Sequence, residues 1–268
     1  MRPERRPLLL LAATAAACWP VWAWYGQRLG DSSEDAIAAA ALVLLVVLSG
    51  RRTAPPTPGP LWPSLVALSA YAASFPFVPG LVRAVLAFLA LGLTWSLWRH
   101  GTPFRPWAVG LALLGLPMAA SLQFYAGYPL RVASGVVALV LLRLSGLSVE
   151  RQGVYLRWGD ELVMIDAPCS GLRMLWAALL LTCCLAGLMG LRPRASLLAL
   201  AAAGALAVLA NGLRAAALFW AETSGRSLPA WPGYTHEAIG VSVFLALALA
   251  LLAVARSLRM TRREPCAP

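Results

Sequence analysis

The sequence predicts an all-α fold, a polytopic bundle of transmembrane helices. Hydrophobic residues fill 60% of the 268 positions and charged residues only 12%, whereas a soluble domain is about half apolar and a quarter charged. Several apolar runs approach the roughly 20 residues that a helix needs to cross about 30 Å of hydrocarbon. None of these runs alternates with a period of two, so a transmembrane β-barrel is excluded.

Nine apolar runs follow one another along the chain. Lipid offers the backbone no hydrogen-bond partner, so each continuous run is expected to be helical. The first run also resembles a secretory signal peptide, because small residues precede Cys18, but we expect an uncleaved anchor. The runs lie at about 7–25, 35–49, 61–79, 81–98, 107–126, 132–147, 170–190, 196–220 and 236–255.

Arginines in the short connections orient the chain, because cytoplasmic loops of membrane proteins are enriched in basic residues. They precede the first run, follow the second and fourth, separate the seventh from the eighth, and continue into the tail. Both termini are therefore expected in the cytoplasm, which requires an even number of spans. These residues are Arg2, Arg5, Arg6, Arg51, Arg52, Arg99, Arg105, Arg192, Arg194, Arg256, Arg259, Arg262 and Arg263.

One of the nine runs must then fail to cross, and residues 132–147 are the best candidate. This run is short, and Arg131, Ser134, Gly135 and Arg143 give it a polar or small edge. Such an edge is typical of a re-entrant or interfacial element. The sequence therefore predicts about eight spans.

The longest segment outside the apolar runs, residues 148–168, predicts a β-hairpin. Two β-prone stretches flank Gly159 and Asp160, a pair typical of hairpin turns. The predicted topology makes the hairpin extracytoplasmic. It leads the chain directly to Cys169, at the start of the seventh major helix.

The net charge of +11 does not indicate a nucleic-acid partner, because the basic residues lie mainly at helix ends. The expected partner of this surface is the lipid bilayer. No cysteine spacing predicts a disulfide framework or a metal site, and no cofactor is expected. Cys18, Cys183 and Cys184 lie in apolar runs and Cys266 in the tail, whereas Cys169 opens a helix.

Three polar residues are expected close together near the outer membrane surface. Cys169 opens the seventh run, Arg214 lies near the outer end of the eighth, and His236 opens the ninth. Arg214 follows Ser196 by about 27 Å of helix. Asn211, on the same helix face, could orient the guanidinium.

Each of these residues also has a structural interpretation. Arg214 could extend its charge to the outer headgroups, Cys169 could be a buried thiol, and His236 could cap its helix. Together they supply a nucleophile, a fixed cation and a proton donor, the groups that acyl transfer needs. Asp166 and Glu237 are near enough in sequence to assist, whereas His100 lies in a predicted cytoplasmic loop.

The segment A-P-C-S-G-L-R at 167–173, the N-x-x-R at 211–214 and His236 before a final apolar helix resemble the exosortase/archaeosortase family. The resemblance is detailed over residues 148–255. It implies a catalytic core there, after N-terminal helices at 1–147 and before a basic cytoplasmic tail at 256–268. These segments form a single integral membrane domain, 1–268.

The resemblance implies a multi-pass enzyme of the cell inner membrane with an extracytoplasmic active site. Such enzymes process proteins with a C-terminal sorting signal made of a short motif, a hydrophobic helix and a basic end. By motif, Cys169 would be the nucleophile, Arg214 the carbonyl stabiliser and His236 the general acid and base. Ser170 and Arg173 match the family motif in a supporting position without an assigned role.

Two other functions remain open at this point. A transporter or a polysaccharide-export assembly subunit could line a polar path with Arg214 and His236. The second alternative is a membrane acyltransferase with a lipid donor, although the sequence has no dedicated signature for it. Replacement of Cys169 separates these functions, because a non-enzymatic protein should tolerate it.

Overall fold

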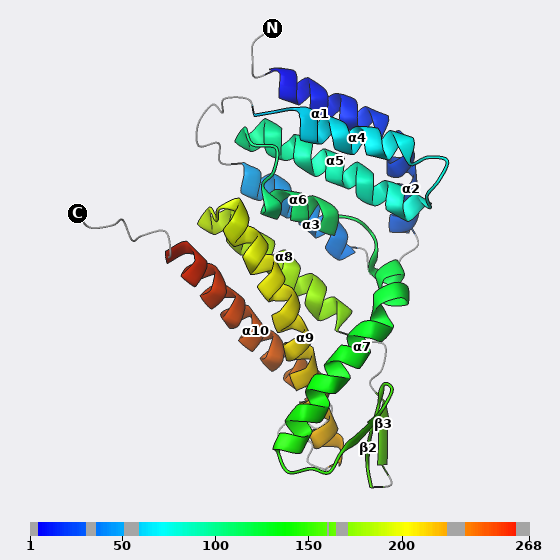
Figure 1. The fold of residues 1–268 in the computed structure, drawn as a ribbon, viewed down its shortest axis with the longest axis vertical. Helices are drawn as coiled ribbons and strands as arrows, with labels where there is room; N and C mark the ends of the chain where they lie inside the picture. The colour runs from blue at the N-terminus through cyan, green and yellow to red at the C-terminus, as the bar shows by residue number, and fades with distance from the viewer. Residues whose placement is uncertain are drawn as a thin grey trace, which may run out of the picture. The chain divides into compact units, whose positions relative to one another are not determined.

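The structure is a computed structural model that describes residues 5–30, 36–50, 59–159, 161–164, 171–223 and 234–260. These residues are mostly helical and include one small antiparallel sheet (Figure 1). The chain divides into two compact units. The first unit comprises Met1–Met118 with Cys183–Leu197, and the second comprises Ala119–Thr182 with Leu198–Pro268.

Among the described residues, the first unit contains six complete helices and is organised around α5. Pro79 precedes α5 in an extended conformation, and Gly101 ends it with a φ of 67°, a left-handed conformation that glycine adopts without strain. Helices α1, α4 and α6 pack on α5. The bounds are α1 Arg5–Ala17, α2 Trp19–Gly30, α3 Ala36–Ser49, α4 Trp62–Ala73, α5 Gly80–His100 and α6 Pro106–Leu114.

An aromatic contact holds the core of the first unit. Tyr25 of α2 stacks on Phe88 of α5, with ring centroids 5.8 Å apart. The Tyr25 hydroxyl donates a hydrogen bond to the Gly115 carbonyl at 2.9 Å. This contact joins α2 and α5 to the end of α6.

The second unit contains α7 and α10 entirely, with parts of α8 and α9. The connection between α8 and α9 belongs to the first unit: Gly190 follows α8 with a φ of 64°, and Pro193 opens α9, the usual placement of glycine after a helix and proline at the start of one. The bounds are α7 Ala119–Leu144, α8 Leu172–Met189, α9 Pro193–Thr223 and α10 Thr235–Met260.

The segment predicted to be a hairpin forms a three-stranded antiparallel sheet. Its strands are β1 Glu150–Gln152, β2 Tyr155–Trp158 and β3 Glu161–Met164, in that spatial order. The turn at Gly159 agrees with the prediction. The sequence analysis missed the first turn, where Gly153 has a φ of 63°.

The sheet packs against the ends of two helices in the second unit. Leu156 of β2 and Val149 before β1 are almost fully buried. They belong to one apolar cluster with Leu142 near the end of α7 and Phe219 near the end of α9. The sheet and the C-terminal ends of α7 and α9 therefore lie together.

The helix boundaries differ from the predicted runs at prolines. The run 107–126 is not one helix, because α6 ends at Leu114 and α7 begins at Ala119, with Pro117 between them. Residues 132–147 are not a separate short element, because α7 continues through Pro129 to Leu144. The helix tolerates this proline, as membrane helices often do.

Five described helices are long and apolar enough to cross a membrane, namely α5, α7, α8, α9 and α10. The pair α1 and α2 is bent by 64° and would add a sixth span if it crosses as one unit. As described, α3 and α4 have 14 and 12 residues, which is short of the roughly 20 that crossing requires. The predicted number of eight spans is therefore not confirmed.

Candidate active site

The segment with the predicted nucleophile ends at a tightly packed glycine. Cys169 and Ser170, like Asp166, lie outside the described residues. Gly171 is buried, with a φ of 82°, and a Cβ there would lie 2.7 Å from Nδ2 of Asn211. Glycine is required at this position by both its backbone conformation and the space available. The end of the Cys-Ser-Gly motif is thereby fixed against α9.

Asn211 joins three helices of the second unit. Its side chain is 1% exposed, and Nδ2 donates a hydrogen bond to the Ser134 hydroxyl of α7 at 2.9 Å. The next residue, Gly212, packs so closely on α7 that a Cβ would lie 2.4 Å from Val137. The start of α8 and the middle of α7 thus meet the same turn of α9.

Arg214 lies one turn beyond Asn211 and faces α10. The Arg214 side chain is half-buried, and a Cβ added at Gly240 would lie 3.5 Å from Nε and 3.8 Å from Cζ. Its buried Nε has no hydrogen-bond partner in the described part of the chain. A cation in an apolar helix is costly when unpaired, so Arg214 is a strong candidate for binding a ligand.

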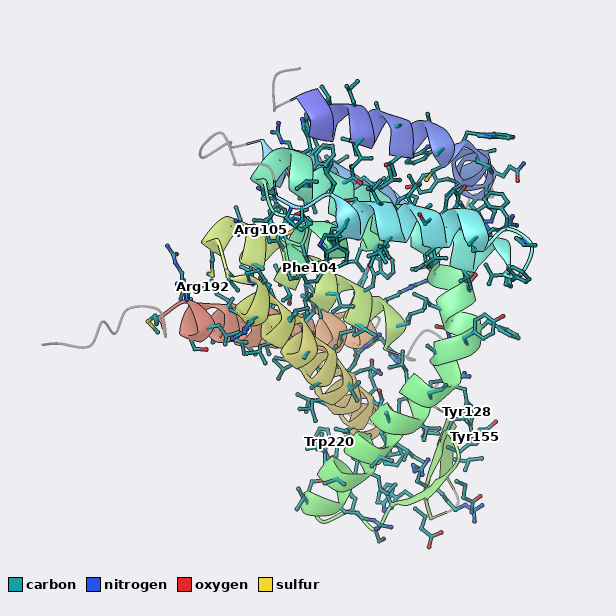
Figure 2. The ribbon with its side chains drawn as sticks, turned by 45° about the horizontal axis from the view of Figure 1, so that its top comes forward. Phe104, Arg105, Tyr128, Tyr155, Arg192 and Trp220 are labelled. Atoms are coloured by element: carbon teal, nitrogen blue, oxygen red, sulfur yellow. The ribbon has the colours of Figure 1, made fainter. Side chains whose placement is uncertain are left out.

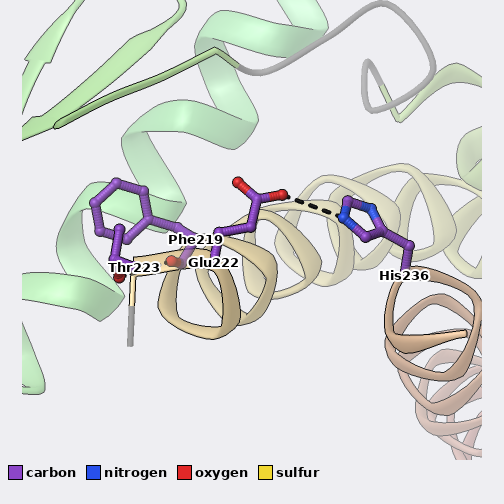
Figure 3. Close-up of polar contacts among 4 residues, drawn as sticks. All are labelled: Phe219, Glu222, Thr223 and His236. Carbon is purple, nitrogen blue, oxygen red and sulfur yellow. Dashed lines mark hydrogen bonds and ion pairs between the residues drawn. The ribbon is translucent and has the colours of Figure 1, made fainter. Parts of the chain in front are cut away.

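His236 is the second residue of α10 and lies one turn before Gly240. Its Nε2 is 3.2 Å from Oε1 of Glu222, in the last turn of α9 (Figure 3). Residues separated by about two turns share a helix face, so Arg214 and Glu222 lie on one face of α9. Arg214, Glu222, His236 and Gly240 together form what we call the α9–α10 interface.

The remaining predicted residues lie nearby or in the first unit. Arg173 is exposed as the second residue of α8, and Glu237 is exposed beside His236. His100 ends α5 in the first unit and packs on Trp107, with ring centroids 5.2 Å apart. Among the described residues, no group of three or more His, Cys, Asp or Glu side chains could hold a metal ion.

The sequence analysis did not assign three residues to the site: Ser134, which it placed only on the polar edge of 132–147, Glu222 and Gly240. Glu222 gives a signal in the sequence, because it follows Arg214 by eight residues on the same helix face. It is also an acidic residue in the last turn of a helix, where the helix dipole disfavours negative charge. Ser134 and Gly240 give no such signal, because their roles depend on which helices pack together.

The fold and the site define a class of protein: a multi-pass membrane protein with polar groups gathered at one interhelical interface. The sequence model of the transmembrane exosortases matches residues 8–254, so this chain belongs to the transmembrane exosortase family. The match confirms the resemblance and extends it to the N-terminal helices. Comparison with curated proteins and with solved structures gives no significant match.

Proposed function

We propose that this protein is a membrane cysteine protease and transpeptidase. It cleaves proteins with a C-terminal tripartite sorting signal at the outer face of the cytoplasmic membrane, and transfers them to an acceptor. Cys169 is the nucleophile, Arg214 stabilises the carbonyl oxygen, and His236 is the general acid and base. Family membership supports the reaction class.

The observation that carries this proposal is the convergence of three chain segments on one stretch of α9. Gly171 packs on Asn211, and Arg214, one turn further, packs on Gly240. Cys169 precedes Gly171 by two residues, a distance that two peptide units limit to about 7 Å. His236 lies one turn from Gly240. The contacts of Gly171 with Asn211 and of Gly240 with Arg214 therefore support a site that Cys169, Arg214 and His236 share.

The length of α9 supports an outer location for the site. Arg192 and Arg194 flank its first residue, Pro193, and basic residues mark the cytoplasmic boundary. Arg214 lies about 32 Å along the helix from Pro193, near the far edge of about 30 Å of hydrocarbon. Exposed Trp220 and Tyr155, toward one end of the second unit in Figure 2, suit the outer interface.

The reaction proceeds through a thioester. The Cys169 thiolate attacks the carbonyl carbon of the scissile peptide, and the Arg214 guanidinium offsets the negative charge that develops on the oxygen. The C–N bond then breaks, and the His236 imidazolium gives its proton to the leaving amine. An acceptor amine or water attacks the thioester, His236 takes its proton, and the thiolate is regenerated.

A membrane-embedded site matches a substrate that carries its own membrane helix. The helix of the sorting signal can dock beside the enzyme from within the bilayer and hold the cleavage motif at the outer surface. Binding in this way makes the reaction effectively intramolecular, which raises its rate. The basic end of the signal stays in the cytoplasm by the rule that orients the enzyme.

Replacement of Cys169 tests the proposal. In cells that contain a substrate with such a signal, Cys169→Ala should abolish processing while the protein still reaches the membrane in normal amounts. Cys184→Ala is the matched control, because this half-buried thiol lies within α8 and should be dispensable. Processing at the wild-type rate by Cys169→Ala would refute the enzymatic function and favour a transporter or assembly subunit.

A further inference from the structure

We propose that Glu222 is a positioning residue for His236. Its carboxylate holds the ring at Nε2, so that Nδ1 takes up and releases the proton that moves during catalysis. The inference rests on the proposed function, because it concerns the same site. Neither the family motif nor the sequence analysis assigns a role to Glu222. The proposal follows from the contact between the ends of α9 and α10.

The contact between the two side chains is direct. Glu222 Oε1 lies 3.2 Å from His236 Nε2, and Figure 3 shows the carboxylate and the ring facing each other. No hydrogen bond to Nδ1 occurs within the described part of the chain. Nδ1 is therefore the ring nitrogen that is free to exchange a proton.

The last turn of α9 is held in place beneath Glu222. The Thr223 hydroxyl donates a hydrogen bond to the Phe219 carbonyl at 2.8 Å. Phe219 is 1% exposed and packs in the apolar cluster under the sheet. The backbone that carries Glu222 is thus anchored, although the carboxylate itself is 44% exposed.

Helix electrostatics disfavour both residues where they are. The carbonyl end of a helix repels an acidic side chain, and the amide end repels an imidazolium. Glu222 is the penultimate residue of α9 and His236 the second residue of α10. Each residue opposes its own helix dipole, and the contact between them offsets both penalties. Two exposed partners contribute little to stability, so a role in folding does not account for the pair.

The other charged groups near His236 do not replace Glu222. Arg214 faces α10 at Gly240, one turn away, and supplies a positive charge. Glu237 is adjacent to His236 in sequence, but the described contacts pair His236 with Glu222 and not with Glu237. Among the described residues, His236 forms an ion pair only with Glu222.

A carboxylate at Nε2 defines how the ring acts. In the neutral ring, Nε2–H donates to Glu222, so the lone pair lies on Nδ1. Nδ1 then takes the proton of the Cys169 thiol and later gives it to the leaving amine. The Glu222 carboxylate offsets the charge of the imidazolium, as an orienting carboxylate does in other triads.

The first measurement compares carboxylate variants by kcat and KM. Glu222→Ala should lower kcat about 10-fold or more, part of the roughly 100- to 10,000-fold that acid–base catalysis contributes, and leave KM unchanged. Glu222→Gln keeps an acceptor oxygen and should lose less. The matched control is Glu237→Ala, which removes a carboxylate one residue from His236 and should retain wild-type kcat. Equal kcat in Glu222→Ala and wild type would overturn the inference.

The second measurement distinguishes positioning from a merely structural role. In a background where Cys169 is the only cysteine, the rate of its alkylation reports the proton transfer to His236 even in inactive variants. Glu222→Ala should slow alkylation several-fold when His236 is present and leave it unchanged in the His236→Ala background. An equal slowing in both backgrounds would show that Glu222 acts on structure alone.

These outcomes separate the inference from the proposed function. If Cys169→Ala retains processing, the enzymatic function is wrong and the role of Glu222 falls with it. If Cys169→Ala and His236→Ala lose processing but Glu222→Ala retains it, only the role of Glu222 is wrong.

Discussion

The guanidinium of Arg214 is the clearest functional group at the scale of single residues. Its Nε is buried without a partner in the described residues, in a helix that is long and apolar enough to cross the membrane. A protein that needed only a snorkelling charge here would be served equally by lysine. Arginine instead presents several planar donors in a fixed arrangement.

Arg214→Lys should therefore fold normally and lose most activity. Loss of an oxyanion donor costs about 100-fold in kcat, and the lysine ammonium cannot reproduce the donor geometry. Initial rates of substrate cleavage in membranes measure the effect. Equal rates for lysine and arginine would mean that the side chain serves only as a charge at the membrane surface.

A matched control, Gly240→Ala, changes the packing around the Arg214 guanidinium and leaves the guanidinium itself in place. Gly240→Ala adds a Cβ 3.5 Å from the Arg214 Nε, which is an ordinary van der Waals distance. This variant should keep near-normal cleavage. A loss as large as that of Arg214→Lys would show that the interface tolerates no added atom, and that the arginine test reports packing rather than chemistry.

Only some residues of the site can be predicted from the sequence. Arg214 and His236 could be predicted because an intramembrane cation and a histidine at a helix start are conspicuous, and helix rise fixes their depth. The pairing of His236 with Glu222 could not, because it depends on how α9 and α10 are aligned along each other. The contact of Gly240 with Arg214 depends on the same alignment, which helix periodicity within one segment does not determine.

At the scale of elements, the entry into α8 depends on one glycine. Gly171→Ala should destabilise this entry twice over. A left-handed conformation costs a non-glycine residue about 1 to 2 kcal/mol, and the new Cβ would clash with Asn211 at 2.7 Å. We expect loss of processing and a reduced yield of monodisperse protein in detergent.

Gly190→Ala is the control for Gly171→Ala. Gly190 also has a positive φ, at 64°, but nothing lies within 4 Å of an added Cβ. It should show only the conformational cost and keep its activity. If both variants behaved alike, contact with Asn211 would not matter and the convergence on α9 would lose its support.

Proline explains most of the difference between predicted runs and observed helices. Proline interrupts a helix because it lacks the amide hydrogen and its ring clashes with the preceding turn. Pro20 follows the bend between α1 and α2, and Pro117 lies between α6 and α7. Pro129 nevertheless lies inside α7. Hydropathy alone cannot distinguish these cases, since the outcome depends on neighbouring helices that compensate for the lost hydrogen bond.

At the scale of the whole molecule, the arginines in the connections between helices are consistent with one cytoplasmic side. In the first unit, Arg105 and Arg192 lie toward the same side in Figure 2, although they are far apart in sequence. Both belong to connections predicted to be cytoplasmic. Within the described residues, five helices, or six with the bent pair, are long and apolar enough to span, so the predicted eight spans are not confirmed; six spans would keep both termini on one side.

Single cysteines test this topology. In a background without the native cysteines, Gln152→Cys and Thr223→Cys should react with an impermeant thiol reagent applied from outside, and Pro193→Cys should not. All three residues belong to described segments near the ends of α9 or in β1. If Gln152→Cys were protected while Thr223→Cys reacted, the bilayer would separate the segment before Cys169 from His236, and the proposed site could not form.

The 31 residues of α9 span about 46 Å, more than the hydrocarbon thickness of about 30 Å. Its final turns, with Glu222, can therefore stand in the aqueous layer while Arg214 remains at the lipid boundary. For a substrate of the proposed class, cleavage at that level sorts the two products by solubility. The protein portion leaves on the water side, and the signal helix stays dissolved in lipid. Separation of the products into two phases then opposes the reverse reaction without any further machinery.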